Sequence, residues 1–286
     1  LIEIATLKGL LIALPIIYRN QDAKIVFWIC GLGTIFLSNK FHHKIIRFFL
    51  IKIYAYIYKN FNTSWIFENH DDKNFFQKNL SLHEKDLTVI PGSGYELKKQ
   101  KSNKKIKKNK IVFIGRLIKD KGIIEYIDAI KNLLSISKNM SWKFEIIGDF
   151  DDNPTSIKKH ELDRLIGKYP IRFAGFVNDM NKYYEEVFCV VLPSYREGLS
   201  RVLIEAGAHS IPSVTTNVTG CRDIIKNNVN GLLISPKSVK ELTNAIQFLI
   251  NNPDISKDMG TNAYNIFKEK YSIETISTMT LNFYKR

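Results

Sequence analysis

From residue 110 to the end of the chain, short apolar segments alternate with longer segments whose apolar residues recur every three or four positions. The short segments are apolar throughout rather than at every second residue, which is typical of parallel strands buried on both faces. Strands are predicted at 110–115, 142–148, 171–175, 188–193, 212–216 and 231–234. Helices are predicted at 121–138, 155–167, 179–186, 200–209, 237–251 and 256–270. This alternation predicts a doubly wound α/β domain with helices on both faces of its sheet.

The first hundred residues follow the same pattern less regularly. Strands are predicted at 23–33, which runs into a glycine-rich turn, at 64–69 and at 87–94, with helices between them. Three strands make only part of a doubly wound sheet, and the chain starts with Leu1 rather than Met. We therefore expect the front of an N-terminal domain to be absent from this sequence.

A lysine-rich segment divides the chain. Residues 98–110 hold eight lysines among thirteen positions and no aromatic residue, which is typical of an exposed linker. We expect a partial N-terminal domain with its linker over residues 1–103 and a second domain over 104–270. Residues 271–286 are predicted to form a helix that packs back toward the N-terminal domain.

The chain is basic, and its charge is unevenly distributed. Lys and Arg number 42 against 28 Asp and Glu, which gives a net charge of +14. Residues 1–110 carry 19 basic and 8 acidic side chains, whereas residues 111–286 carry 23 and 20. This surplus in the first third indicates a polyanionic neighbour, such as a membrane surface, a nucleic acid or a phosphorylated substrate. The hydrophobic fraction of 45% excludes a mainly disordered chain.

The three cysteines, Cys30, Cys189 and Cys221, are too few and too scattered for a disulfide framework or a zinc site. Cys30 and Cys189 lie inside apolar runs, so we expect them to be buried, reduced thiols of a cytosolic protein. The apolar opening segment is interrupted by two charged residues and a proline. The sequence shows no secretory signal and no uninterrupted span of about 20 apolar residues.

The segment 195–208, YREGLSRVLIEAGA, follows a predicted strand and begins a helix near Leu199 or Ser200. A helix N-terminus at the carboxyl end of a parallel strand offers unpaired N–H groups and the positive end of the helix dipole. Gly198 lets a ligand approach the backbone closely, because it has no Cβ. The segment therefore predicts an anion site.

Two carboxylates in this segment stand eight positions apart. Glu197 lies just before the helix and Glu205 about two turns inside it, where they can accept hydrogen bonds from sugar hydroxyls on either side of a bound diphosphate. The alternative is structural: Glu205 pairs with Arg201 one turn earlier and Glu197 favours the helix dipole. Together these contacts are worth a few tenths of a kcal/mol.

The loop 115–122, GRLIKDKG, follows the strand predicted at 110–115. It carries Arg116 and Lys121 at the carboxyl end of a parallel strand, where open α/β sheets bind ligands. A guanidinium and an ammonium can neutralise a diphosphate without a metal. The alternative is a solvated basic loop in which Gly122 eases entry into the next helix.

Two further patterns suggest metal sites but are weaker. Asp149 and Asp151 have the Asp-x-Asp spacing of metal-dependent transferases, but we favour a polar loop here and expect no metal. The adjacent His42 and His43 have no third ligand in view.

Residues 44–61 combine six aromatic residues with four basic ones. This composition fits either a core helix of the N-terminal domain or an amphipathic helix at a membrane surface, and we favour membrane contact. The basic residues are Lys44, Arg47, Lys52 and Lys59.

The two loop motifs together are far more specific than either alone. GRL-x₃-KG after one strand, followed some eighty residues later by E-G-L-S-x-V-x-x-E-A, resembles the nucleotide-sugar half of GT-B glycosyltransferases. It resembles in particular glycosyltransferase family 4, whose signature is a Glu-x₇-Glu pair. The likeness covers residues 110–286 and includes 146–149, 172–177, 190–194 and 217–234.

This resemblance implies two Rossmann-like doubly wound domains that face a cleft, with the N-terminal one incomplete. It implies that Arg116 and Lys121 hold the donor diphosphate. It also implies that Glu197 meets the sugar hydroxyls and the distal phosphate and that Glu205 holds the ribose hydroxyls. The implied donor-binding residues are Gly115, Arg116, Lys121, Gly148, Glu197, Gly198, Leu199, Ser200 and Glu205.

The front of the chain adds a narrower resemblance. Segments 28–38, 66–76 and 89–94 are similar to bacterial enzymes that build O-antigen, capsule or N-glycan oligosaccharides on undecaprenyl-diphosphate. Gly31 and Gly33 stand where many other family 4 enzymes carry a His, and we include both glycines among the binding residues. The resemblance also implies that this chain is an N-terminally truncated fragment.

The implied activity is retaining transfer of a hexosyl or N-acetylhexosaminyl group from a nucleoside diphosphate, UDP in particular, to a lipid-linked or cell-surface saccharide. The implied place is the inner face of the cell membrane. The alternatives are a nucleotide-sugar epimerase or hydrolase of the same fold, and a basic module that binds nucleic acid or an anionic membrane. A nucleic-acid partner is not expected, because no nucleic-acid motif accompanies the lysine run.

Overall fold

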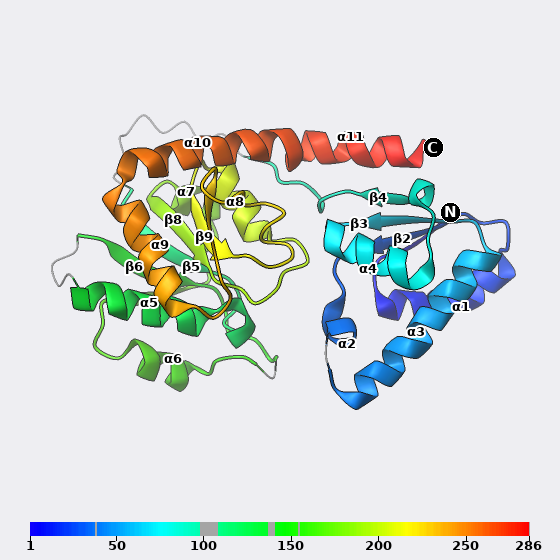
Figure 1. The fold of residues 1–286 in the computed structure, drawn as a ribbon, viewed down its shortest axis with the longest axis horizontal. Coiled ribbons are helices and arrows are strands. Elements are labelled where there is room, and N and C mark those ends of the chain that lie inside the picture. The colour runs from blue at the N-terminus through cyan, green and yellow to red at the C-terminus, as the bar shows by residue number, and fades with distance from the viewer. Residues whose placement is uncertain (38, 98–107, 137–140, 154, 286) are drawn as a thin grey trace. The chain divides into compact units, whose positions relative to one another are not determined.

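The computed structural model describes residues 1–37, 39–97, 108–136, 141–153 and 155–285 (Figure 1). The chain forms two compact units: the first comprises Leu1–Ser93 with Ile276–Arg286, and the second comprises Gly94–Thr275. The boundary therefore falls between Ser93 and Gly94 rather than after residue 103. The lysine-rich residues 98–107 lie outside the described residues.

The second unit is built on a six-stranded sheet in the order β10-β9-β8-β5-β6-β7. Every strand pair in it is parallel, as predicted. The strands are β5 (Lys110–Ile114), β6 (Lys143–Ile147), β7 (Ile171–Gly175), β8 (Val187–Leu192), β9 (Ser213–Thr216) and β10 (Gly231–Ile234).

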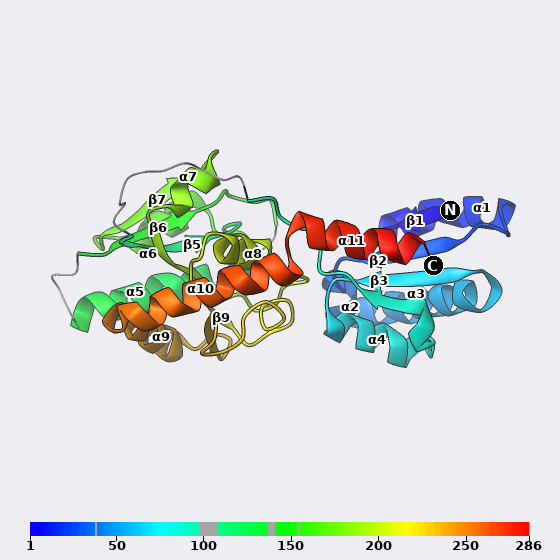
Figure 2. The same ribbon diagram turned by 90° about the horizontal axis from the view of Figure 1, so that it is seen from above.

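Both faces of this sheet are buried. Along β5, Ile111 and Phe113 belong to one apolar cluster, whereas Val112 and Ile114 belong to another on the opposite face. The helices α5 and α9 lie side by side on one of these faces (Figures 1 and 2). The prediction of a doubly wound α/β domain is thus confirmed. The helices are α5 (Ile123–Ile136), α6 (Lys159–Ile166), α7 (Met180–Tyr184), α8 (Arg201–Ala208), α9 (Val239–Asn251) and α10 (Pro253–Lys270).

The first unit has a four-stranded parallel sheet in the order β1-β2-β3-β4. Helices α1 and α3 cover one face of the sheet and α11 covers the other (Figure 1). The strands are β1 (Ile2–Ile4), β2 (Ile25–Ile29), β3 (Thr63–Phe67) and β4 (Leu87–Val89). The helices are α1 (Leu7–Arg19), α2 (Gly33–Leu37), α3 (Phe41–Asn60), α4 (His70–Leu80) and α11 (Ile273–Tyr284).

Three expectations about individual segments were wrong. The first unit has a fourth strand, β1, whose three residues include a glutamate and are too few to give a periodic signal. Cys30 is exposed, because β2 ends at Ile29 and leaves the thiol beyond the buried strand. Lys110, expected in the exposed linker, is buried in β5, where its ammonium lies 3.1 Å from Glu186 and over the ring of Tyr183.

Candidate functional site

Three loops meet at the carboxyl ends of the neighbouring strands β5, β8 and β9. The loop after β8 is hydrogen-bonded on one side to the loop after β5, through the N–H of Tyr195 and the carbonyl of Asp120 at 2.8 Å. On its other side the N–H of Glu197 donates to the carbonyl of Thr219, in the loop after β9, at 3.2 Å. The central loop is therefore held from both sides at the edge where open α/β sheets bind ligands.

Lys121 and Glu197 form an ion pair in this junction. The ammonium nitrogen lies 2.6 Å from Oε1 and 2.7 Å from Oε2 of the carboxylate, so it bridges both oxygens. The Glu197 side chain is only 9% exposed and that of Lys121 19%, which limits screening by solvent. The structure thus brings two of the predicted site residues into direct contact.

The close fit of the loops depends on Gly122 and Gly220. Both have φ of +75°, a conformation that favours glycine. A Cβ on Gly122 would lie 2.1 Å from the carbonyl oxygen of Pro193. A Cβ on Gly220 would lie 2.7 Å from Glu197 Cβ and from the carbonyl oxygen of Gly198. Any side chain at Gly220 would therefore displace the backbone that carries Glu197.

The helix α8 begins at Arg201, directly after the predicted binding residues Gly198, Leu199 and Ser200. Its first turn contains no acidic residue, so the positive end of the helix dipole is not offset within the helix. The N–H of Ser200 makes a long hydrogen bond of 3.4 Å to the carbonyl of Gly220. The first residue of this helix is four positions after Glu197 in the chain.

The structure turns Arg116 toward Asp151 instead of toward the Lys121–Glu197 pair. A guanidinium nitrogen of Arg116 donates to Asp151 Oδ2 at 2.8 Å, and the Arg116 side chain is 60% exposed. The N–H of Asn153 donates to Oδ1 of the same carboxylate at 2.8 Å. The Asn153 N–H and the Arg116 guanidinium lower the pKa of Asp151. Both oxygens of Asp151 are thus engaged, and among the described residues no cluster of three His, Cys, Asp or Glu is arranged to hold a metal.

Glu205 accepts two hydrogen bonds inside the second unit. Arg201 Nε donates to Oε1 at 2.9 Å, which is the pairing that the structural alternative predicted, and the Tyr184 hydroxyl donates to Oε2 at 3.2 Å. Burial and the Glu205 carboxylate raise the pKa of Tyr184 well above its ordinary value. The Glu205 side chain remains 16% exposed, so its carboxylate is still accessible at the surface.

The predicted glycines Gly115 and Gly148 stand directly after β5 and β6. The N–H of Gly115 donates to the carbonyl of Ile147 and the N–H of Gly148 to that of Gly175, each at 3.0 Å. These bonds extend the sheet by one residue past the strand ends. The two glycines thus shape the sheet edge beside the loop that carries Arg116.

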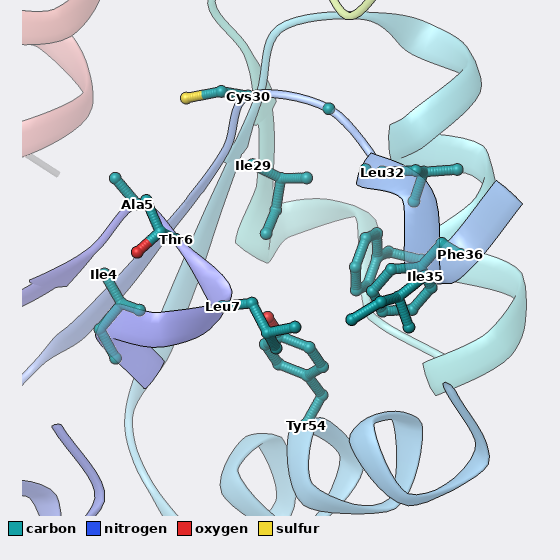
Figure 3. A pocket seen from close by; sticks show the side chains of 13 residues that line it. Ile4, Ala5, Thr6, Leu7, Ile29, Cys30, Leu32, Ile35, Phe36 and Tyr54 are labelled. Carbon is teal, nitrogen blue, oxygen red and sulfur yellow. The ribbon is translucent and has the colours of Figure 1, made fainter. Parts of the chain in front are cut away.

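The other predicted glycines, Gly31 and Gly33, line a cavity of about 290 Å³ in the first unit, at the carboxyl ends of β1 and β2 (Figure 3). Most of the lining is aliphatic or aromatic, and Cys30 stands at its rim. Although Cys30 is exposed as a residue, partial desolvation of its thiol, and then the Glu68 carboxylate, raise the pKa of the thiol to about 12. The labelled apolar lining side chains are Ile4, Ala5, Leu7, Ile29, Leu32, Ile35, Phe36 and Tyr54.

Sequence reasoning missed several residues of the junction. Tyr195 and Glu125 are joined by a hydrogen bond, and Gly220 packs against Glu197. The only available signals were local: Tyr195 stands two positions before Glu197, and Glu125 four positions after Lys121. Neither spacing indicates that the two side chains meet, because the contact joins the loop after β8 to the first turn of α5, 70 positions away in the chain.

The two parallel α/β units are Rossmann-like, and the chain has the GT-B glycosyltransferase fold of its structural neighbours. The chain belongs to the family described as Glycosyl transferases group 1, whose model matches residues 95–266, more than half of the sequence. This confirms the resemblance to GT-B glycosyltransferases and the fold class.

Two relatives illustrate the likeness in sequence. The chain is 30% identical over 178 residues to the capsular polysaccharide biosynthesis glycosyltransferase CapM of Staphylococcus aureus, covering 62% of this chain and 46% of CapM. It is 26% identical over 247 residues to N,N'-diacetylbacillosaminyl-diphospho-undecaprenol alpha-1,3-N-acetylgalactosaminyltransferase of Campylobacter jejuni, covering 82% of this chain and 63% of that enzyme. The chain thus spans roughly half to two thirds of the length of these relatives.

Solved structures show the same fold at lower identity. Anabaena HepE, in a crystal structure with UDP-glucose, has a TM-score of 0.79 and 19% identity, covering 99% of this chain and 78% of HepE. Sucrose-phosphate synthase of Thermosynechococcus elongatus has a TM-score of 0.77 and 18% identity, covering 99% and 72%.

Proposed function

We propose that this chain carries the donor site of a retaining glycosyltransferase of family 4 that transfers a sugar from a UDP-sugar to a lipid-linked or cell-surface saccharide. The observation that carries this proposal is the Lys121–Glu197 pair, held beside the start of α8 where three strand-end loops meet. The names of the Staphylococcus and Campylobacter relatives support a capsular or undecaprenol-linked product. The UDP-glucose complex of HepE supports a uridine donor.

The proposed chemistry is mainly electrostatic. The acceptor oxygen bonds to the anomeric carbon while the bond from that carbon to the diphosphate oxygen breaks, and the acceptor proton passes to a donor phosphate oxygen on the same face. Negative charge therefore grows on the leaving diphosphate, where Lys121 and the N-terminus of α8 stabilise it. In this proposal no side chain acts as a nucleophile and no metal is required.

Each carboxylate has a separate proposed role. Glu197 accepts hydrogen bonds from the transferred sugar, and Glu205 accepts them from the ribose. Glu205 is suited to this role because Arg201 and Tyr184 already fix the direction of its oxygens. Arg116 adds positive charge to the diphosphate after exchanging Asp151 for a phosphate oxygen.

We further propose that α3 contacts the anionic inner face of the cell membrane, where a lipid-linked acceptor resides. Leu50, Tyr54 and Ile57 of α3 are buried in the first unit, so one side of the helix belongs to the core. Another side exposes large apolar side chains together with lysines, which is the composition of an interfacial helix. The exposed residues are Phe41, Lys44, Ile45, Ile46, Phe48, Phe49, Lys52, Tyr56 and Lys59. No helix within the described ranges has the length and apolar character needed to span a bilayer.

Binding of a panel of UDP- and GDP-sugars, measured by saturation-transfer NMR and calorimetry, tests the donor site. We expect a UDP-sugar to bind and Lys121→Ala to weaken binding by about ten- to a hundredfold, because a charge-assisted contact to the diphosphate is lost. Lys119→Ala is the matched control: Lys119 lies in the same turn but pairs with Glu161 at 3.3 Å. Equal binding by the Lys121 variant, or no binding of any nucleotide sugar by the natural chain, would contradict the proposal.

A further inference from the structure

Tyr195 connects the two loops that carry the Lys121–Glu197 pair. Its hydroxyl donates a hydrogen bond of 2.6 Å to Oε1 of Glu125, in the first turn of α5. Its backbone N–H donates to the carbonyl of Asp120, immediately before Lys121. Tyr195 thus joins the loop after β8 to the loop after β5 through its backbone, and to the helix α5 that follows that loop through its side chain.

The Glu125 carboxylate is buried and has few hydrogen-bond donors around it in the described part of the chain. The residue is 9% exposed, and Oε2 is buried without a hydrogen-bond partner among the described residues. A buried carboxylate that lost its remaining donor would leave both oxygens unpaired, which is costly. The hydrogen bond from Tyr195 is therefore strongly favoured over alternatives in which the phenol turns to solvent.

Lys237, which lies in the loop between β10 and α9, restricts the orientation of the Tyr195 ring. The ammonium of Lys237, in the segment between β10 and α9, lies 4.9 Å from the centre of the Tyr195 ring. Cation–π contact of this kind favours one orientation of the ring. With its hydroxyl fixed by Glu125 and its ring by Lys237, Tyr195 has little freedom, and Glu197 follows it by only two residues.

We propose that Glu125 and Tyr195 are positioning residues of the donor site: their hydrogen bond sets the place of Glu197 beside Lys121 and so controls recognition of the transferred sugar. This inference rests on the proposed function, in which Glu197 meets the sugar hydroxyls. In this proposal neither Glu125 nor Tyr195 contacts the donor. Their effect passes through the backbone of residues 195–197, because the loop can move only if the phenol leaves Glu125.

Comparison of a UDP-sugar with UDP tests the inference, using the full chain and the sugar that binds it best in the panel above. We expect Tyr195→Phe and Glu125→Gln each to reduce the preference for the UDP-sugar over UDP by about tenfold, as a misplaced charged hydrogen-bond acceptor would. The affinity for UDP should change less than about twofold. A merely structural role would weaken the binding of both ligands equally and leave the ratio of their affinities unchanged. That result would overturn the inference.

Tyr126→Phe is the matched control. Tyr126 is also in α5 and fully buried, and its hydroxyl donates to the backbone carbonyls of Ile111 and Glu145 at 2.8 and 3.1 Å. Its loss should lower stability without changing the preference between the ligands. A change in preference equal to that of Tyr195→Phe would show that loss of stability alone moves the ratio.

A double-mutant cycle with Glu197→Gln supplies the second readout. Once Glu197 no longer carries its charge, Tyr195→Phe should cause little further loss of preference, because both changes act on the same contact. Additive losses would overturn the inference. If the natural chain binds UDP-sugars but the ratio is unaffected by Tyr195→Phe, the positioning role alone fails; if it binds none, the proposed function fails first.

Discussion

At the scale of single residues, the proposed donor site depends on backbone contacts as much as on charged side chains. Lys121 and Glu197 meet only because glycines allow three loops to approach within van der Waals distance. Lys121 and Glu197 were each predicted as site residues from loops that follow strands, but their ion pair was not predicted. The neighbouring Glu125 and Tyr195 were not predicted as site residues, because no local pattern encodes a contact between residues 70 positions apart.

Gly220→Ala tests the backbone contribution. The new methyl group would clash with Glu197 and Gly198, so we expect it to destabilise the second unit and to abolish sugar-dependent binding. Gly175→Ala is the control, since Gly175 has φ of +67° but open space around its Cβ position. Denaturant unfolding should show Gly220→Ala to be worse than Gly175→Ala by about 2 kcal/mol. Equal costs would mean that backbone strain alone is responsible.

At the scale of elements, long apolar strands and strongly periodic helices were predictable, and short or context-dependent elements were not. β8 is apolar throughout and β5 is apolar after Lys110, because both faces of the sheet are covered, so their composition alone identifies them. β1 has three residues and gives no such signal. The composition of residues 44–61 left open whether they form a core helix or an interfacial helix. Both environments select aromatic and aliphatic side chains.

Vesicle binding tests the proposed role of α3. We expect the chain to bind phosphatidylglycerol vesicles and Phe48→Ser/Phe49→Ser to reduce this binding at least about tenfold, because each phenyl group contributes more than 1 kcal/mol on burial. These rings are 58% and 60% exposed. Phe176→Ser is the control, as Phe176 is 70% exposed but lies in the second unit. Unchanged co-sedimentation of the double variant would rule out α3 as the contact.

At the scale of the whole molecule, the half-buried His209 makes stability depend on pH. His209 ends α8, stacks on Tyr184 with ring centres 4.7 Å apart, and lies 3.1 Å from Asn181 Oδ1 and 3.5 Å from the Tyr95 hydroxyl. Burial, with a smaller effect of the Lys108 charge, lowers the pKa of His209 to about 4. The folded chain therefore keeps this imidazole neutral where the unfolded chain protonates it.

The sign of the resulting dependence is fixed. Because the pKa of His209 is depressed from its ordinary 6.5, the unfolded state binds up to one more proton between about pH 6.5 and pH 4, and the free energy of unfolding falls as pH falls through this range. His209→Gln should remove this part of the slope. Urea unfolding at several pH values measures it, and parallel slopes for both proteins would contradict the expectation.

The ion pair between Lys121 and Glu197 has a consequence for how the empty site meets a ligand. Since the ammonium is already paired with a carboxylate, the pyrophosphate of the proposed donor would exchange one anionic partner of Lys121 for another. Long-range attraction from Lys121 is correspondingly weak. Ionic strength should therefore have little effect on the contribution of this lysine to the association rate. In the proposed function, discrimination among donor sugars then takes place after contact. It depends on whether the sugar offers hydroxyl groups that donate to the displaced Glu197 carboxylate.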